Sequence, residues 1–159
     1  LKEREMSEYT KHLVPRPELR ERIIDTAVEA ISAHGIKSIT MDDIAPSLGI
    51  SKRTLYEVFS DKETLLEECI LKGQKEGDEF LKNVLATSGN VLEVLLKCYQ
   101  RSIEQFHATN KKFFEDFKKY PKAYALMTNR HNQDSEETVN FFKEGVKQGI
   151  FRDDVTDSC

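Results

Sequence analysis

The chain of 159 residues has no tryptophan and only three cysteines, Cys69, Cys98 and Cys159. Three scattered cysteines, an odd number, do not make the disulfide framework of a small secreted domain. We expect them to be small buried apolar residues or, for the last one, an exposed thiol in the tail. A reducing cytoplasm is the compartment that this usage indicates.

Long apolar runs are missing as well. No stretch approaches the roughly 18 apolar residues of a membrane span, and no charged-then-apolar leader precedes the first domain. Alternation typical of a β-strand never extends beyond a few residues, and there are no internal repeats or low-complexity tracts. Because 38% of the residues are apolar and 33% are charged, the chain can form a core. We therefore expect a helical protein with no membrane partner.

The chain also lacks an excess of positive charge, since its net charge is −4. Residues 16–62 contain seven Lys and Arg against eight Asp and Glu. This balance argues against a non-specific nucleic-acid coater. It does not exclude a specific binder, because the local field and not the total charge steers a phosphate. Lys52, Arg53 and Lys62 are grouped, whereas Asp25 lies on a different predicted helix.

The motifs of common enzymes are absent. The sequence has no Gly-rich phosphate loop, no Gly-x-Ser-x-Gly elbow, no His-Glu-x-x-His and no paired-cysteine metal signature. His107 and His131 have no His or Cys three or four residues away, the spacing at which helical metal ligands pair. We predict a protein that is not an enzyme and that needs neither a metal nor a cofactor.

What the chain does contain is a helix-turn-helix pattern in residues 40–62. Counted from Met41 as position one, positions 4, 8, 10, 15 and 18 are apolar, position 5 is small and position 9 is glycine. These residues are Ile44, Ala45, Leu48, Gly49, Ile50, Leu55 and Val58. A small residue lets the second helix approach the first, glycine suits the left-handed turn, and the apolar positions hold both helices on a preceding one. This pattern predicts DNA binding.

Apolar spacing and capping residues predict helices along the rest of the chain. The expected helices are 17–34, 41–48, 52–59, 62–85, one capped by Asn90 that carries apolar residues to Phe106, a short aromatic stretch opened by Thr109 and Asn110, and one from Pro121 to Lys147. The predicted division is an N-terminal arm over residues 1–14, a DNA-binding domain over 15–60 and a helical regulatory domain over 61–159. The arm is either disordered or an extra helical turn.

The sequence Gly-Ile-Ser-Lys-Arg-Thr-Leu-Tyr-Glu-Val-Phe from Gly49, followed by Asp-Lys-Glu-Thr-Leu-Leu, resembles the TetR family of bacterial transcriptional regulators. The resemblance covers residues 20–68 closely, and fainter family phrases begin at Phe113 and Glu144. It implies an all-α fold with a three-helix helix-turn-helix DNA-binding head followed by a helical ligand-binding and dimerisation body. Family members continue into two further helices that form the dimer interface. By this resemblance, the chain is shortened at Cys159 or its final segment is not visible.

The positions of the motif, together with the resemblance, predict which residues contact DNA. They are Thr40, Ser51, Lys52, Arg53, Thr54, Tyr56 and Lys62. The planar fork of Arg53 can bond O6 and N7 of a guanine, and the hydroxyl of Tyr56 can donate to a phosphate. Thr40 and Lys62 are expected at phosphates. Glu57 departs from the family pattern, and near DNA it would repel a phosphate or accept from a cytosine amine.

Aromatic residues are concentrated in the second half of the chain. They form the core of the body or, as the resemblance implies, line an apolar ligand cavity there. The predicted pocket residues are Tyr99, Phe106, Phe113, Phe117, Tyr120, Tyr124, Met127 and Phe141. We therefore expect a homodimeric cytoplasmic repressor that a small-molecule effector releases from a palindromic operator in double-stranded DNA. The alternatives are a helical protein-interaction module and a regulator that keeps the fold without an effector pocket.

Overall fold

The computed structural model describes residues 16–152, without the side chains of residues 131–136. The described residues form helices and no strands, so the predicted all-α class is confirmed. The helices are α2 (Arg16–His34), α3 (Met41–Ser47), α4 (Lys52–Val58), α5 (Lys62–Thr87), α6 (Val91–Ala108), α7 (Lys111–Phe117) and α8 (Pro121–Lys147). The predicted arm over residues 1–14, the thiol of Cys159 and the side chain of His131 lie outside this description.

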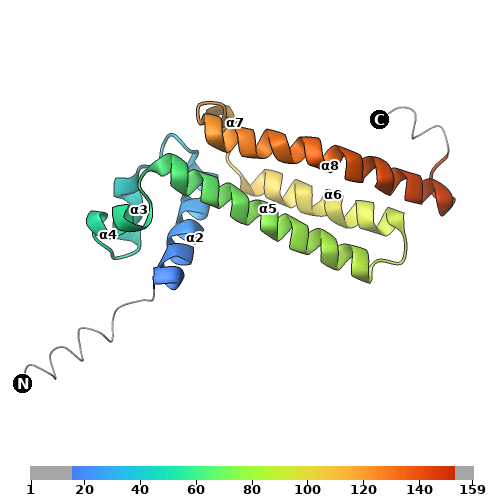
Figure 1. The fold of residues 1–159 in the computed structure, drawn as a ribbon, viewed down its shortest axis with the longest axis horizontal. Helices are drawn as coiled ribbons and strands as arrows, with labels where there is room; N and C mark the ends of the chain where they lie inside the picture. Colours follow the sequence, from blue (N-terminus) through green and yellow to red (C-terminus); the bar gives the residue numbers. More distant parts are fainter. Residues whose placement is uncertain (1–15, 153–159) are drawn as a thin grey trace, which may run out of the picture.

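The helices form two groups joined by α5, as Figure 1 shows. Helices α2, α3 and α4, which we call the head, gather at one end of the molecule. Helix α5 leaves the head and packs along α6 and α8, and we call α5 to α8 the body. The short α7 connects α6 to α8 and packs against α2, so the body contacts the head through both α5 and α7.

Side-chain caps fix where several helices begin. Ser51, Asp61, Asn90 and Asn110 each accept a hydrogen bond from a backbone N–H in the first turn of α4, α5, α6 and α7, respectively. Such caps satisfy N–H groups that have no partner within the helix. The predicted starts at Ser51, Asn90 and Asn110 are confirmed, and so is the start of α8 at Pro121.

The turn between α3 and α4 has the conformation that the motif requires. Gly49 has a φ of +66°, in the left-handed region. Its N–H donates to the carbonyl oxygen of Pro46 at 3.0 Å, and the N–H of Ile50 donates to that of Ala45 at 3.1 Å. This pair of bonds closes α3 as a Schellman motif, which favours glycine. Ile50 then packs on the core.

The apolar motif positions lie inside the head, as predicted. Ile44, Ala45 and Leu55 are buried, and Leu48 and Val58 pack partly buried against them. The same cluster continues into the first turns of α5 and reaches α7 and α8. Its members from those helices are Leu65, Leu66, Cys69, Ile70, Phe117 and Ala123. The start of α5 is therefore built into the core of the head, which fixes the direction in which the body leaves it.

Candidate nucleic-acid interface

Helix α4 presents its polar side to the surface of the head. Leu55 is fully buried beneath it, whereas Tyr56 is 48% exposed. Ser51 caps the helix by accepting from the N–H of Thr54 at 3.1 Å, and the two hydroxyls lie 2.9 Å apart. The first turn of α4 therefore displays two hydroxyls and the residues between them.

The cations of α4 are paired with carboxylates. The ammonium of Lys52 lies 2.6 Å from the Asp42 carboxylate on α3, and this hydrogen bond raises the pKa of Lys52. The guanidinium of Arg53 bonds the Glu57 carboxylate one turn later at 3.0 Å. All four side chains are exposed, and surface ion pairs of this kind contribute little to stability. A phosphate or a base edge can therefore replace the carboxylate partner at small cost.

The start of α3 is held by a local hydrogen-bond pair. The Asp43 carboxylate accepts from the backbone N–H of Thr40 at 2.8 Å and from its hydroxyl at 2.6 Å. These bonds lower the pKa of Asp43. The hydroxyl of Thr40, predicted to meet a phosphate, is directed at Asp43 in this structure.

Lys62 lies in a different environment from the other predicted DNA contacts. Its ammonium donates to the carbonyl oxygen of Ile36, in the connection between α2 and α3, and lies 5.7 Å from the centre of the Tyr120 ring. Partial burial lowers the pKa of Lys62. In this structure the ammonium is directed at the junction of head and body. Sequence reasoning did not anticipate the contact, because Tyr120 stands far along the chain.

Five of the eight predicted pocket residues belong to two groups of aromatic rings. Phe106, Phe113, Phe117 and Tyr124 belong to one row of rings with Phe114, with successive centres 5.3–6.1 Å apart. Near the end of α8, Phe141 contacts Phe142, which contacts Phe151. The structure therefore brings the residues near α7 together and places Phe141 in a separate aromatic cluster.

The outer face of α6 is apolar and exposed. Its large exposed apolar residues follow one another at intervals of four and three, which places them on one side of the helix. They are Leu92, Leu96, Tyr99, Ile103 and Phe106. Tyr99 is 66% and Phe106 is 68% exposed, and on α8 Tyr124 and Met127 are also exposed. Four of the predicted pocket residues, Tyr99, Phe106, Tyr124 and Met127, are therefore exposed to solvent in this structure.

The junction of α7 with the head contains functional candidates that sequence reasoning missed. The backbone N–H of Asn110 donates to the carbonyl oxygen of Ser32 at 2.7 Å, and its side-chain amide donates to that of Ala33 at 3.1 Å. The Asp116 carboxylate, which is buried, accepts from the backbone N–H of Lys37 at 2.8 Å. The bonds from Asn110 satisfy carbonyls at the end of α2, which have no partner within the helix.

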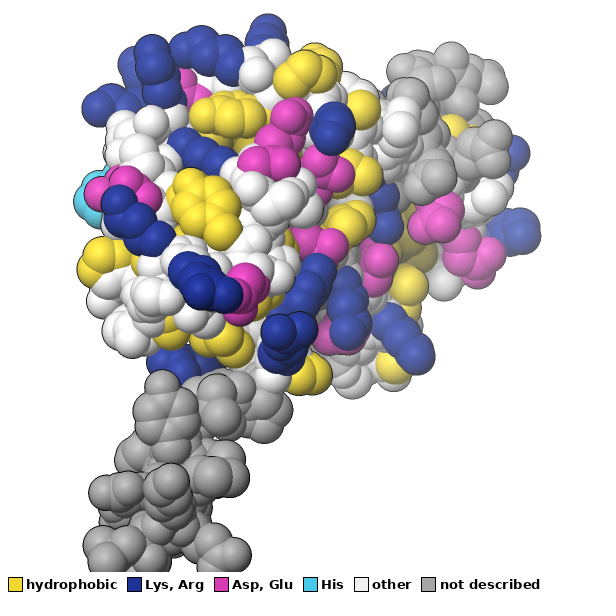
Figure 2. All heavy atoms as spheres, turned by 60° about the vertical axis from the view of Figure 1, so that its left-hand side comes forward, with side chains coloured by type: hydrophobic (Ala, Val, Ile, Leu, Met, Phe, Trp, Pro, Cys, Tyr) yellow, Lys and Arg dark blue, Asp and Glu magenta, His cyan; other side chains and the backbone are white. Residues whose placement is uncertain are grey.

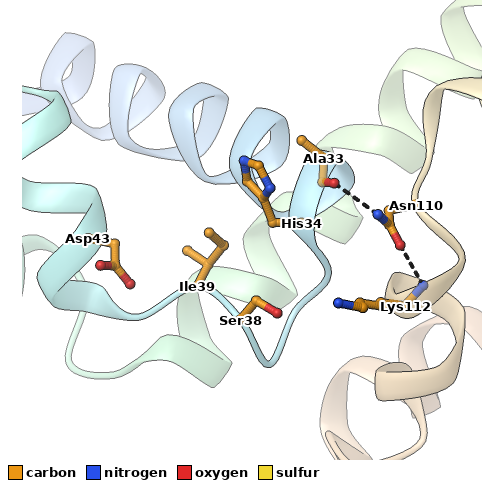
Figure 3. A pocket seen from close by; sticks show the side chains of 7 residues that line it. All are labelled: Ala33, His34, Ser38, Ile39, Asp43, Asn110 and Lys112. Carbon is orange, nitrogen blue, oxygen red and sulfur yellow. Dashed lines mark hydrogen bonds between the residues drawn. The ribbon is translucent and has the colours of Figure 1, made fainter.

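A groove of about 500 Å³ opens beside this junction, as Figure 3 shows. It is lined by Ala33, His34, Ser38, Ile39, Asp43, Asn110 and Lys112. These residues come from the end of α2, the connection to α3, the start of α3 and the start of α7. The groove therefore places side chains of the body next to the first turn of α3.

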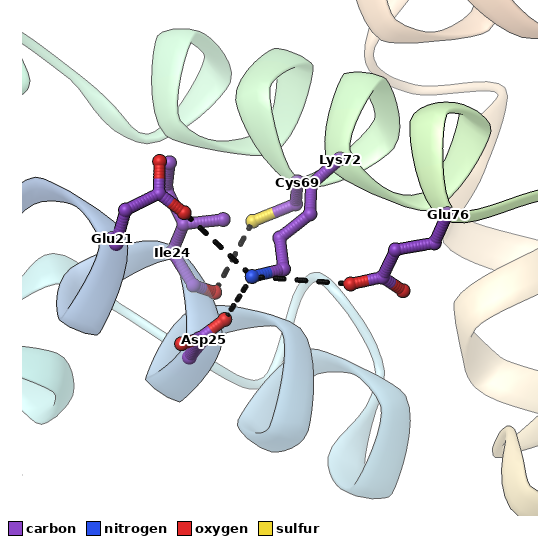
Figure 4. Close-up of polar contacts among 6 residues, drawn as sticks. All are labelled: Glu21, Ile24, Asp25, Cys69, Lys72 and Glu76. Carbon is purple, nitrogen blue, oxygen red and sulfur yellow. Dashed lines mark hydrogen bonds and ion pairs between the residues drawn. The ribbon is translucent and has the colours of Figure 1, made fainter. Parts of the chain in front are cut away.

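A second set of polar contacts joins α2 to α5, as Figure 4 shows. The ammonium of Lys72 lies within 4 Å of three carboxylates, those of Glu21, Asp25 and Glu76. Beside it, the buried thiol of Cys69 donates to the carbonyl oxygen of Ile24 at 3.9 Å. Burial raises the pKa of Cys69 to about 12, so the thiol stays protonated and unreactive at neutral pH.

The described residues contain neither a metal centre nor a membrane span. Among them, no group of three or more His, Cys, Asp or Glu side chains is arranged to hold a metal ion. None of the described helices is both long enough and apolar enough to cross a bilayer.

Comparison with protein families matches residues 23–69 to the family described as bacterial regulatory proteins, tetR family. The HTH-type transcriptional repressor KstR2 of Mycolicibacterium smegmatis is 27% identical over 141 residues, which cover 86% of this chain and 69% of that protein. The biofilm operon icaADBC HTH-type negative transcriptional regulator IcaR of Staphylococcus aureus is 25% identical over 111 residues, covering 70% of this chain and 54% of that protein. The chain thus spans about half of the length of IcaR.

Solved structures show the same fold. A transcriptional regulator from Saccharomonospora viridis, in complex with choline, superposes with a TM-score of 0.75 at 24% identity, covering 86% of this chain and 74% of that one. The ketosteroid transcriptional regulator KstR2 of Mycobacterium tuberculosis superposes with a TM-score of 0.65 at 22% identity, covering 85% of this chain and 71% of that one. The proteins named here are regulators of transcription, and none is named as an enzyme.

Proposed function

We propose, on the premise that this chain is a transcriptional regulator of the TetR family, that it represses transcription by binding a specific operator through α4. The observation that carries the proposal is the helix-turn-helix itself. Its turn is closed by Gly49, Leu55 is buried beneath α4, and Lys52, Arg53 and Tyr56 stand on the exposed side. A recognition helix reads the major groove with the residues of its first turns.

Arg53 is the proposed base-reading residue. Its side chain is 89% exposed, and Glu57 holds the Nε atom, which leaves both terminal nitrogens without a bond to that carboxylate. Two donors of a guanidinium match O6 and N7 of guanine. In this proposal Glu57 orients Arg53, so the acid that departs from the family pattern serves recognition without touching a phosphate.

The other predicted contacts are proposed to bind the DNA backbone. They are Thr40, Ser51, Lys52, Thr54, Tyr56 and Lys62. Tyr56 is exposed, and its hydroxyl is proposed to donate to a phosphate, while Lys52 exchanges the Asp42 carboxylate for another phosphate. Ser51 and Thr54 offer hydroxyls at the start of the same helix. Thr40 must first give up its contact with Asp43, and Lys62 its contacts at the junction of head and body.

Two heads are proposed to act together. One recognition helix covers only part of one groove, and two-fold dimers bind half-sites about 34–36 Å apart. The complete regulator is therefore proposed to be a homodimer on a palindromic operator in the bacterial cytoplasm. The exposed apolar face of α6 supports this proposal, because it leaves surface for further packing on the described part of the body.

A small-molecule effector is proposed to control this binding from the body. Support comes from the row of rings between Phe106 and Tyr124, and from the related regulator that was solved with choline. Helices α5 and α7 both pack on the head, and in this proposal they transmit a change in the body to the head. The proposed effector is a hydrophobic or aromatic molecule, and its differential affinity sets the size of the response.

In vitro selection tests the proposed operator binding. Full-length protein is incubated with a library of random double-stranded DNA, and bound fragments are amplified and sequenced over several rounds. We expect enrichment of one inverted repeat with half-sites about one helical turn apart. Recovery of unrelated sequences with no common motif would contradict the proposal. Arg53→Ala protein, selected in parallel, should lose preference at one base pair in each half-site.

A further inference from the structure

The positive charge on the recognition surface of the head is already paired. Lys52 and Arg53 each bond a carboxylate, at 2.6 and 3.0 Å, and residues 16–62 contain more acidic than basic side chains. Affinity for DNA depends on the number of phosphates that Lys and Arg neutralise. A second source of positive charge close to the head would therefore matter for binding.

Such a source surrounds α7. Lys37, Lys111, Lys112, Lys118 and Lys119 are all exposed, and we call them the α7 lysine cluster. Within residues 111–119 the only acidic residues are Glu115 and Asp116. Glu115 pairs with Lys111 at 3.5 Å, and Asp116 with Lys119 at 3.4 Å. In the described part of the chain, Lys37, Lys112 and Lys118 have no carboxylate within ion-pair distance.

The fold holds this cluster rigidly against the head. Asp116 is buried and joins α7 to the head, because one of its carboxylate oxygens accepts from the backbone N–H of Lys37 at 2.8 Å while the other faces Lys119. The backbone at Lys112 lies very close to Gly35, because a Cβ added to Gly35 would be only 2.7 Å from the Cβ of Lys112. Two hydrogen bonds from Asn110 to the end of α2 complete the docking. These contacts hold the backbone that carries the lysines against the end of α2 and the connection to α3, while the lysine side chains are exposed.

The cluster lies beside the proposed DNA-binding surface. Lys112 lines the groove that also contains Ile39 and Asp43, at the start of α3. Figure 2 looks toward the end of the molecule that α3 and α4 form, and it shows Lys and Arg side chains gathered along the upper left edge of that view. In Figure 1, α7 lies at the top of the molecule, at the same height as this edge.

We propose that the α7 lysine cluster is a second phosphate-binding surface, which contacts the DNA backbone beside the operator half-site read by α4. This inference rests on the proposed function. The cluster is exposed and extended, and lysine ammonium groups act as flexible point charges that suit phosphates without selecting a base. It supplies affinity and salt dependence but no sequence preference. The alternative binding partner for the α7 lysine cluster is an acidic protein surface.

The test compares two double variants of the full-length protein. Lys37→Gln/Lys112→Gln removes two charges from the cluster. Lys75→Gln/Lys82→Gln removes two exposed charges from α5, where neither lysine has a carboxylate within ion-pair distance among the described residues. Fluorescence anisotropy measures the affinity of wild type and both variants for the selected operator at several salt concentrations. Two duplexes are used, one trimmed to the half-sites and one with natural flanking sequence. Circular dichroism checks that each variant is folded.

The cluster variant should lower the slope of log K against log salt by about 0.9 for each phosphate that is no longer neutralised, up to about 1.8 in total. This decrease should appear on the flanked duplex and shrink on the trimmed one, and the α5 control should behave as wild type. If the two variants have equal slopes of log K against log salt while wild type still selects its operator, the phosphate-binding role of the cluster is overturned and the proposed function is not. That result would favour an acidic protein as the partner of the cluster. Wild type that binds no DNA selectively would reject the proposed function as well.

Discussion

The docking of α7 on the head can be tested with a pair of glycine substitutions. Gly35 and Gly49 both have left-handed backbones, with φ of +87° and +66°. Placing alanine in this region costs roughly 1–2 kcal/mol at either position. Around Gly49 nothing lies within 4 Å of an added Cβ, whereas at Gly35 the Cβ would meet the Lys112 Cβ at 2.7 Å and its backbone carbon at 3.3 Å. Relieving such overpacking costs about 1–3 kcal/mol more.

We therefore expect Gly49→Ala to destabilise the protein by about 1–2 kcal/mol and Gly35→Ala by about 2–5 kcal/mol. Urea unfolding followed by circular dichroism measures both, and equal m-values show that the surface exposed on unfolding has not changed. The difference between the two variants isolates the packing of α7 on the head. Equal decreases in stability would refute the close docking of α7.

Three further predictions follow from the site. Arg53→Ala should weaken binding to the operator by about 1–3 kcal/mol while leaving binding to random DNA nearly unchanged, as anisotropy titrations will show; equal weakening on both would contradict base reading. The N–H of Lys37 is the chief cause that lowers the pKa of Asp116, so the carboxylate stabilises the fold above about pH 4 and this stabilisation is lost as the pH falls. Asp116→Asn should therefore reduce the loss of unfolding free energy at acid pH, measured by urea unfolding at several pH values. An unchanged loss at acid pH would contradict the contribution of Asp116. An effector that weakens operator binding about 5- to 150-fold should itself bind operator-bound protein more weakly by the same factor; calorimetry that finds equal effector affinities for free and operator-bound protein would contradict the proposed control.

Local sequence signals predicted the helices and the motif well. The caps at Ser51 and Asn90 and the turn at Gly49 depend on residues only a few positions apart, so spacing in the sequence determines them. The apolar positions of the helix-turn-helix are equally local, since a helix of fixed period places Ile44 and Leu48 on one face. These features are confirmed because neighbouring residues alone decide them.

Contacts between distant segments were not predictable in this way. Lys62 meets Tyr120, and Asp116 meets the N–H of Lys37, only because α7 returns to the head after the whole of α5 and α6. The aromatic residues show the same limit. The resemblance grouped Phe106 and Phe141 in one predicted pocket, whereas the structure places their rings in two separate clusters. Charge pairing between α3 and α4 likewise depends on how the helices cross.

The central claim is that α4 gives this protein sequence-specific DNA binding. The most direct test is an anisotropy titration of the full-length protein with the selected operator and with a shuffled duplex of the same length and composition, at physiological salt. Sequence-specific DNA-binding proteins bind their sites about 10³-fold or more tightly than non-specific DNA, and we expect at least that ratio. Equal affinities for the two duplexes would contradict the account.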